Sequence, residues 1–305
     1  FPSPHFNGRY YRSTDEVICI SKVTHKILQE VAPEVSSCYL PHAVNSNIFH
    51  KYKTEADAAE VAVLRDQILN QGKYQGQDRK IFLWNNRNAR RKQSGTLIWW
   101  FKEFLDEVGH DKACLLMHTD ARDPHGQDLP YIIEFLGVNQ GEVFLSTQKV
   151  EPTELARLYN VADFTINISD AEGFGLSTLE SLSCGTPIIV NMTGGLQEQV
   201  TDGKNWFGFG LQPSAKAIIG SLEVPYIYED RCSQKDFNNA LKSALTINPK
   251  TYKKMSIQGR EHVKKNYSFE NYEKKWVELM DKIVEKHGSW KTRKVYKRWH
   301  LLEVA

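Results

Sequence analysis

The stretch from Asp163 to Val200 constrains the fold of this chain most tightly. It opens with a short, β-rich apolar run, Phe164–Ile168, which polar residues and glycine then break. A helical pattern follows over Gly175–Ser183 with leucines on one face, and Thr186–Val190 begins a second strand, after which we expect loop up to Val200. A strand–helix–strand unit of this kind predicts a parallel sheet.

The loop between that strand and that helix carries the chemistry. Gly173 and Gly175 lack Cβ atoms, so a ligand can approach the backbone there. The helix directs free N–H groups and its positive dipole end at the loop, which favours a phosphate. Glu172 and Glu180 disfavour a phosphate, but carboxylates accept hydrogen bonds from sugar hydroxyls. The combination indicates a nucleotide sugar, and the alternative is an ordinary crossover with a surface glutamate.

Three ordered motifs in this stretch resemble retaining glycosyltransferases of the GT-B fold, particularly glycosyltransferase family 4 (group 1). Glu172-Gly-Phe-Gly-Leu-(x3)-Glu180 resembles the E-x7-E motif of that family. Cys184-Gly-Thr-Pro187 is similar to its A-x-G-x-P, and Gly194-Gly-(x2)-Glu-(x)-Val200 to its G-G-x-x-E-x-V. The resemblance covers the donor-binding half of such an enzyme, so it implies a Rossmann-like domain that binds a nucleotide sugar.

A basic cluster follows the apolar run Lys80–Trp84. Four cations lie within residues 87–92, and they require anions if they are buried. The cluster is either a solvated loop, a nucleic-acid patch, or a ligand site at the carboxyl end of a strand. Arg87 and Lys92 have the spacing of the R-x4-K motif of the family, although Gln93 replaces its usual glycine. A shifted register would make Arg90 or Arg91 the diphosphate ligand.

The resemblance assigns roles to these residues. Arg87 and Lys92 would neutralise the charge that grows on the departing diphosphate, and Glu172 would orient the donor sugar rather than act as a nucleophile. Glu180 would hold the ribose hydroxyls. The sequence contains no D-x-D motif, which metal-dependent glycosyltransferases of the other main fold use. The resemblance implies transfer that retains the anomeric configuration and proceeds without a bound metal, and no cofactor is expected. The residues expected to bind the donor, such as a UDP- or GDP-sugar, are Gly173, Phe174, Gly175, Leu176, Ser177, Thr178, Glu180 and Val150.

The predicted fold class is α/β: a Rossmann-like, doubly wound parallel sheet followed by C-terminal helices. Residues 1–45 resemble the last unit of an N-terminal, acceptor-binding domain with its linker, and they contain strands at Val17–Ser21 and Cys38–Leu40 around a helix. Residues 46–225 form the donor-binding domain, and residues 226–305 form helices and a basic, aromatic tail. About 150 further residues would complete the first domain, so we expect either a fragment or a separate partner.

The other elements follow from apolar periodicity and from breaks at glycine and proline. We expect loop over Phe1–Arg12 and irregular structure over Gln212–Asp230. Strands are expected at Lys80–Trp84, Ala113–Met117 and Val143–Ser146. Helices are expected at Thr24–Val31, Glu55–Leu69, Thr96–Val108, Leu129–Phe135, Pro152–Tyr159, Gln234–Leu245, Pro249–Lys265 and Phe269–His287.

Composition excludes several classes of protein. A formal net charge of +2 over 305 residues gives no general signal for nucleic acid, so none is expected as a partner. The sequence contains no run of about 18 apolar residues, so it predicts no membrane span. Five widely spaced cysteines without a CxxC motif indicate reduced thiols in a cytoplasmic protein. The tail mixes cations with aromatic side chains, so it packs, contacts an anionic membrane surface or, as the alternative to the expected absence of such a partner, binds nucleic acid.

The expected function is therefore a retaining hexosyltransferase, an enzyme. The alternatives are another GT-B enzyme, such as a nucleotide-sugar epimerase, and a non-catalytic nucleotide-sugar-binding or scaffold protein. The presence of Glu172, Glu180, Arg87 and Lys92 argues against the scaffold, because a degenerate site would lose some of them. The sugar, the base and the acceptor are not encoded in any pattern of this sequence.

Overall fold

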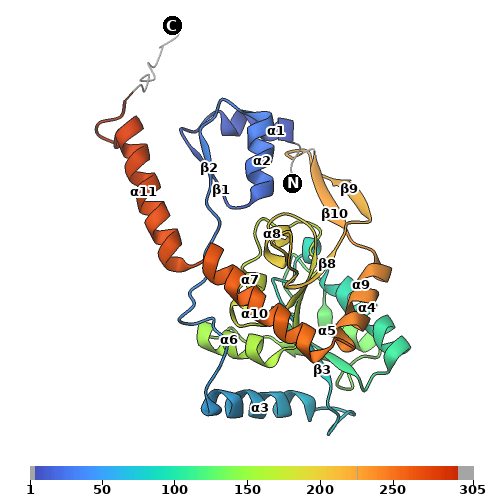
Figure 1. Ribbon diagram of the computed structural model, residues 1–305. Helices are drawn as coiled ribbons and strands as arrows, with labels where there is room; N and C mark the ends of the chain where they lie inside the picture. Colours follow the sequence, from blue (N-terminus) through green and yellow to red (C-terminus); the bar gives the residue numbers. More distant parts are fainter. Residues whose placement is uncertain (1–3, 225, 295–305) are drawn as a thin grey trace.

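A six-stranded parallel sheet forms the centre of the protein in the computed structural model, which describes residues 4–224 and 226–294 (Figure 1). The strand order is β5-β4-β3-β6-β7-β8, so the chain winds outward from β3 and then returns to continue on the other side. The predicted α/β, doubly wound sheet is confirmed. Its strands are β3 (Lys80–Asn85), β4 (Ala113–His118), β5 (Val143–Ser146), β6 (Phe164–Asn167), β7 (Ile188–Asn191) and β8 (Gly208–Leu211).

Helices cover both faces of this sheet, which explains why its strands read as nearly continuous apolar runs. In β3, Phe82 and Trp84 face one core while Ile81 and Leu83 face the other, and all four are fully buried. The first core is covered by α4 (Ser94–Val108), α5 (Leu129–Phe135) and α9 (Gln234–Leu245). The second is covered by α3 (Glu55–Leu69), α6 (Pro152–Val161), α7 (Leu176–Ser183), α8 (Leu196–Val200) and α10 (Pro249–Asn266).

A small N-terminal unit stands apart from the main sheet. Its parallel strands β1 (Val17–Cys19) and β2 (Ser37–Tyr39) flank α2 (Lys22–Val31), as expected. The expected loop at the start of the chain is wrong, because α1 (Pro4–Tyr11) is a helix. A tertiary contact decides this: α1 packs on α2, and the Arg12 guanidinium donates a hydrogen bond to the carbonyl of Val31 at 2.8 Å.

The segment expected to be irregular contains an antiparallel hairpin of β9 (Ala215–Ile219) and β10 (Ile227–Arg231). Contacts with the main sheet hold it: the Asp230 N–H donates to the carbonyl of Asp170 at 2.8 Å, and the Asn191 amide donates to the carbonyl of Asp230 at 2.6 Å. These partners are distant in sequence, so no local pattern announces them. The expected loop before Val200 is also wrong, because α8 is helical there.

The last helix, α11 (Phe269–His287), has the predicted bounds but no buried residue. Figure 1 shows it rising past the N-terminal unit, where the His287 ring lies 3.9 Å from the Asp15 carboxylate. The expected basic, aromatic tail lies outside the described residues from residue 295 onward. All five cysteines are free thiols. Among the described helices, none combines the length and apolar character needed to cross a membrane.

Candidate active site

Three loops meet at the carboxyl edge of the sheet, around the point where the strand order reverses. They follow β3 (residues 86–93), β4 (residues 119–128) and β6 (residues 168–175). In open α/β sheets, ligands bind in the crevice outside such a switch point. The predicted cations lie on the first of these loops, and the loop that begins the E-x7-E motif is the third.

Lys92 and Glu172 form a buried ion pair across two of these loops. The Lys92 ammonium contacts the Glu172 carboxylate and donates to the Asn86 side-chain oxygen at 2.9 Å. Only 9% of the Lys92 side chain and 11% of the Glu172 side chain are exposed. Burial lowers the pKa of the Lys92 ammonium, and the neighbouring Glu172 carboxylate offsets part of this change. The structure thus joins two predicted catalytic residues that are 80 positions apart.

Arg87 is placed differently from Lys92. Its guanidinium forms a two-point ion pair with Asp123, with Nε–Oδ2 at 2.6 Å and Nη2–Oδ1 at 3.1 Å, and 61% of the side chain is exposed. Arg87 lowers the pKa of the Asp123 carboxyl to about 2. The pair connects the loop after β3 to the loop after β4.

The two arginines of the alternative register, Arg90 and Arg91, have different partners. Arg91 donates to the carbonyl of Ala171 at 2.9 Å and lies 3.9 Å from the Glu172 carboxylate. Arg90 instead forms a two-point pair with the buried Glu229 of β10, at 2.5 and 3.1 Å. Arg91 is therefore a second cation beside Glu172, whereas Arg90 anchors the hairpin.

Gln93 explains how the loop accommodates the missing glycine of the R-x4-K motif. Its φ is 58°, which lies in the left-handed region that glycine adopts most easily. The side-chain amide donates to the Asp170 carboxylate, while its oxygen accepts from the Thr96 hydroxyl at 2.7 Å. These bonds compensate for the unfavourable backbone, and they join the loops after β3 and β6. Burial raises the pKa of Asp170 to about 6, although the Gln93 amide opposes this.

The N-terminus of α7 is open to a ligand. Gly175 precedes it with φ of 94°, and no side chain caps the first turn. Gly173 and Leu176 are exposed and Ser177 is half-buried, so their backbone is accessible. Phe174 and Thr178 are buried, and the Thr178 hydroxyl bonds to the carbonyl of Gly175 at 2.8 Å. These two donor-site candidates support the loop from within.

Glu180 lies behind the same edge. It accepts a hydrogen bond from the Tyr159 hydroxyl at 2.8 Å, which in turn accepts one from the Asn85 amide at 2.7 Å. Burial raises the pKa of Glu180 to about 7, and the bond from Tyr159 opposes this increase. Sequence reasoning missed Tyr159 and Asn85. Val150 lies half-buried in the loop between β5 and α6, two strands away from β3.

Several buried donor atoms at this edge have no partner within residues 4–224 and 226–294. They include the Asn86 and Asn167 side-chain nitrogens and the Thr119 hydroxyl. Unsatisfied buried donors are rare in folded proteins and indicate water or a polar ligand. The carboxyl edge therefore offers cations and unpaired donors. Searching the described chain for groups of three or more His, Cys, Asp or Glu residues suited to a metal ion gives none.

The residues behind the donor loop were also missed. The Gln199 amide donates to the carbonyls of Phe174 and Gly175 at 2.8 and 3.1 Å, and its oxygen accepts from the Thr178 hydroxyl at 2.7 Å. A Cβ atom on Gly195 would lie 2.6 Å from the Cα of Phe174, so only glycine fits. The G-G-x-x-E-x-V-like motif thus supports the loop that begins the E-x7-E-like motif. Its glycine pair, Gly194-Gly195, is the sequence signal from which this support could have been predicted.

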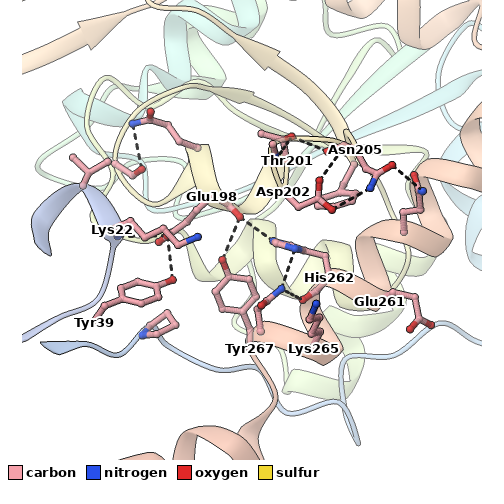
Figure 2. A pocket seen from close by; sticks show the side chains of 18 of the residues that line it. Lys22, Tyr39, Glu198, Thr201, Asp202, Asn205, Glu261, His262, Lys265 and Tyr267 are labelled. Atoms are coloured by element: carbon pink, nitrogen blue, oxygen red, sulfur yellow. Dashed lines mark hydrogen bonds between the residues drawn. The ribbon is translucent and has the colours of Figure 1, made fainter. Parts of the chain in front are cut away.

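A cavity of about 840 Å³ lies on the far side of α8 (Figure 2). Lys22 and Tyr39 of the N-terminal unit line it, together with Glu198 of α8 and His262 and Lys265 of α10. Neither Lys92 nor Glu172 lines this cavity. It is therefore separate from the edge where the predicted donor residues meet.

A doubly wound parallel sheet with an open helix N-terminus at its switch point is the architecture of Rossmann-like nucleotide-binding domains. The sequence model of the family described as "Glycosyl transferases group 1" matches residues 78–262, which is more than half of the chain. The chain belongs to this family.

Individual relatives agree with this assignment. The chain is 28% identical over 230 residues to alpha-monoglucosyldiacylglycerol synthase of Streptococcus pneumoniae, which covers 74% of this chain and 49% of that protein. Sucrose-phosphate synthase from Thermosynechococcus elongatus has a similar fold, with a TM-score of 0.71, 20% identity, and coverage of 93% of this chain and 62% of that one. HepE of Anabaena, solved with UDP and glucose, gives a TM-score of 0.66, 16% identity, and coverage of 92% and 68%. The chain thus spans about half the length of its curated relative.

Proposed function

We propose that this protein transfers a hexosyl group from a UDP- or GDP-sugar to an acceptor hydroxyl, with retention of the anomeric configuration and without a metal ion. The observation that carries the proposal is the placement of Lys92. Its ammonium is buried against Glu172, which lies in the loop that leads into the uncapped N-terminus of α7. This arrangement provides fixed positive charge next to a carboxylate that can receive sugar hydroxyls.

Fixed positive charge serves the leaving group. When the bond between the anomeric carbon and the diphosphate breaks, the electron pair goes to the phosphate oxygen and the sugar becomes oxocarbenium-like. Lys92 and Arg91, together with the N–H groups of the first turn of α7, would stabilise that oxygen. Arg87 would join them after exchanging Asp123 for the diphosphate. These groups would take the role that a metal ion has in other transferases.

The two glutamates take different roles. Glu172, paired with Lys92, would accept hydrogen bonds from hydroxyls of the donor sugar and so fix its orientation. Glu180 would accept hydrogen bonds from the ribose. Its raised pKa means that Glu180 is only partly ionised near neutral pH. A hydrogen bond donated by a ribose hydroxyl would favour the carboxylate form.

The names of relatives support a first choice of donor. The Streptococcus pneumoniae relative is named a glucosyl-lipid synthase, and HepE was solved with UDP and glucose. UDP-glucose is therefore the first donor to test, followed by GDP-mannose. We propose no particular acceptor.

Calorimetric titration with UDP, GDP, UDP-glucose and GDP-mannose tests the proposal. We expect micromolar binding of one diphosphate that Lys92→Ala and Glu180→Gln weaken, while Lys102→Ala, on the outer face of α4, does not. If no nucleotide diphosphate binds, the transferase proposal is wrong. Binding without turnover of any acceptor would indicate the non-catalytic alternative. Activity that survives a chelator, with an α-product from an α-donor by NMR, tests metal independence and retention.

A further inference from the structure

Helix α8 lies below the N-terminal unit in Figure 1, close to α7. Consecutive side chains of α8 bind the N-terminal unit and the donor loop (residues 172–178). Glu198 binds the N-terminal unit, and Gln199 binds the donor loop. A helix of five residues that is fixed on both sides can move only together with its partners. The two contacts therefore form a continuous connection through α8.

The contact with the N-terminal unit is made by one buried carboxylate. The Oε2 atom of Glu198 accepts hydrogen bonds from the Tyr39 hydroxyl at 3.1 Å and from the backbone N–H of Lys22 at 3.4 Å. Lys22 is the first residue of α2, so the carboxylate also lies at the positive end of that helix dipole. Figure 2 shows Tyr39 pointing at this carboxylate. Only 9% of Glu198 is exposed, and burial raises its pKa.

The backbone of Glu198 is fixed independently. Its carbonyl accepts hydrogen bonds from the His262 ring at 2.9 Å and from the Tyr267 hydroxyl at 3.2 Å, both visible in Figure 2. The carboxylate and the carbonyl thus hold the N-terminal unit on one side and α10 on the other. The Oε1 atom of Glu198 has no partner among the described residues.

The contact with the donor loop leaves little freedom. Gln199 donates to the carbonyls of Phe174 and Gly175, and Gly195 is packed against the Phe174 backbone without space for a Cβ atom. A shift of α8 would therefore move the backbone that precedes α7. That backbone directs the N–H groups expected to face the diphosphate.

We propose that α8 couples the position of the N-terminal unit to the shape of the donor loop, with Glu198 as the positioning residue. Any effect of this coupling on sugar transfer rests on the proposed function of the donor loop. The coupling itself does not depend on that function. Apart from backbone bonds within their own sheet and helix, the hydrogen bonds of Glu198 and Tyr39 within the described chain go to each other, to Lys22 and to α10 and the residue after it. Their influence on residues 172–178 would therefore pass through Gln199. A direct route also exists, because the His42 ring packs edge-on against Phe174 with centroids 5.3 Å apart. The test has to separate the two routes.

Amide hydrogen exchange of the ligand-free protein provides a readout that requires no donor. Tyr39→Phe removes one hydrogen bond to Glu198, so we expect exchange within residues 172–178 to accelerate by about fivefold. Glu198→Gln should accelerate it by about tenfold or more, because a charged acceptor is lost. Glu261→Gln is the matched control: it makes the same chemical change in the same cavity, but Glu261 is exposed and points away from Glu198 in Figure 2.

A double-mutant cycle separates the routes. If α8 carries the coupling, the effects of Tyr39→Phe and Gln199→Ala on exchange of the donor loop will not add. Gln199→Ala alone breaks the connection, so Tyr39→Phe should have little further effect in the double variant. Additive effects, or loop exchange unaffected by Tyr39→Phe, would overturn the proposal. Global unfolding would accelerate amide exchange equally in β3, β4 and the donor loop. If Glu198→Gln shows this pattern, the conclusion is drawn from the milder Tyr39→Phe.

Donor affinity then distinguishes this proposal from the proposed function. If UDP-glucose and GDP-mannose do not bind the unsubstituted protein while the exchange coupling is present, the transferase proposal fails and the coupling stands. If donors bind, we expect Tyr39→Phe to weaken binding by a few-fold and Glu261→Gln to leave it unchanged. Donor binding that is insensitive to Tyr39→Phe and Glu198→Gln would remove any role of the coupling in transfer.

Discussion

Two cations on one loop, each paired with a carboxylate of another loop, show how differently similar sequence elements are used. Lys92 and Glu172 are nearly buried and connect the loops after β3 and β6. Arg87, five positions earlier on the loop after β3, pairs with Asp123 of the loop after β4. In this pair 61% of the Arg87 side chain is exposed but only 9% of the Asp123 side chain, so solvent reaches mainly the cation. Exposed ion pairs are screened by water and salt, whereas breaking a buried pair leaves an uncompensated charge. The comparison predicts that the buried pair dominates both stability and donor binding.

Lys92→Ala should have the largest effect. It leaves Glu172 buried without its cation, so we expect a loss of about 3 kcal/mol in the free energy of unfolding. Removal of a cation from the leaving group should also slow transfer by at least about 100-fold. Denaturant unfolding and initial rates measure the two effects. The double variant Lys92→Met/Glu172→Gln should recover stability but not activity, and recovery of both would show that Lys92 has only a structural role.

The pH dependence of stability should reveal the buried carboxyl of Glu180. Glu180 has no ion-pair partner in the part of the chain that the structure describes, and its pKa is raised to about 7. The folded state therefore holds this proton more tightly than the unfolded state. The stabilisation is complete below the unfolded pKa, near 4.5, and is lost as the pH rises through about 7.

The expected decrease attributable to Glu180 between pH 4.5 and pH 8 is at most about 3 kcal/mol. Glu180→Gln should remove this component of the decrease, while Glu154→Gln, at the exposed start of α6, should not. Denaturant unfolding at pH 5 and pH 8 measures it. Identical slopes in the original protein and Glu180→Gln would contradict the raised pKa.

Arg87→Ala should have a smaller effect than Lys92→Ala. The side chain is exposed and already paired, so we expect donor affinity to fall by about tenfold or less, and less still at high salt. Asp123→Asn frees Arg87 for the diphosphate and should maintain or increase affinity. Calorimetric titration at two salt concentrations measures both variants. A loss for Arg87→Ala equal to that for Lys92→Ala would break the comparison between the pairs.

The smallest effect is expected at Gln93, the residue next to the buried pair. Gln93→Ala and Gln93→Gly both remove the bond to Asp170, but only glycine relieves the left-handed backbone. We therefore expect the alanine variant to be less stable than the glycine variant by about 1 kcal/mol. Unfolding in denaturant measures the difference. Equal stabilities would show that the backbone at φ 58° carries no strain.

Much of the fold could be predicted because it is encoded locally. The bounds of α3, α5, α9 and α11 match those expected from apolar spacing and capping residues. The loop at Glu172 to Gly175 was recognisable because glycines and an adjacent helix start serve a phosphate in any sequence context. α1 and the β9–β10 hairpin were missed because each depends on partners distant in the chain.

The sequence alone determined the parallel sheet, the group 1 family and the set of charged residues at its carboxyl edge, since periodicity, glycine positions and motif spacing are local properties. Only the tertiary structure decided which charges meet. It buried Lys92 against a carboxylate 80 positions away, left Arg87 exposed beside Asp123, and placed Glu198 and Gln199 between two units. Burial and pairing depend on which distant segments pack together, and the spacing of residues along the chain does not contain that information.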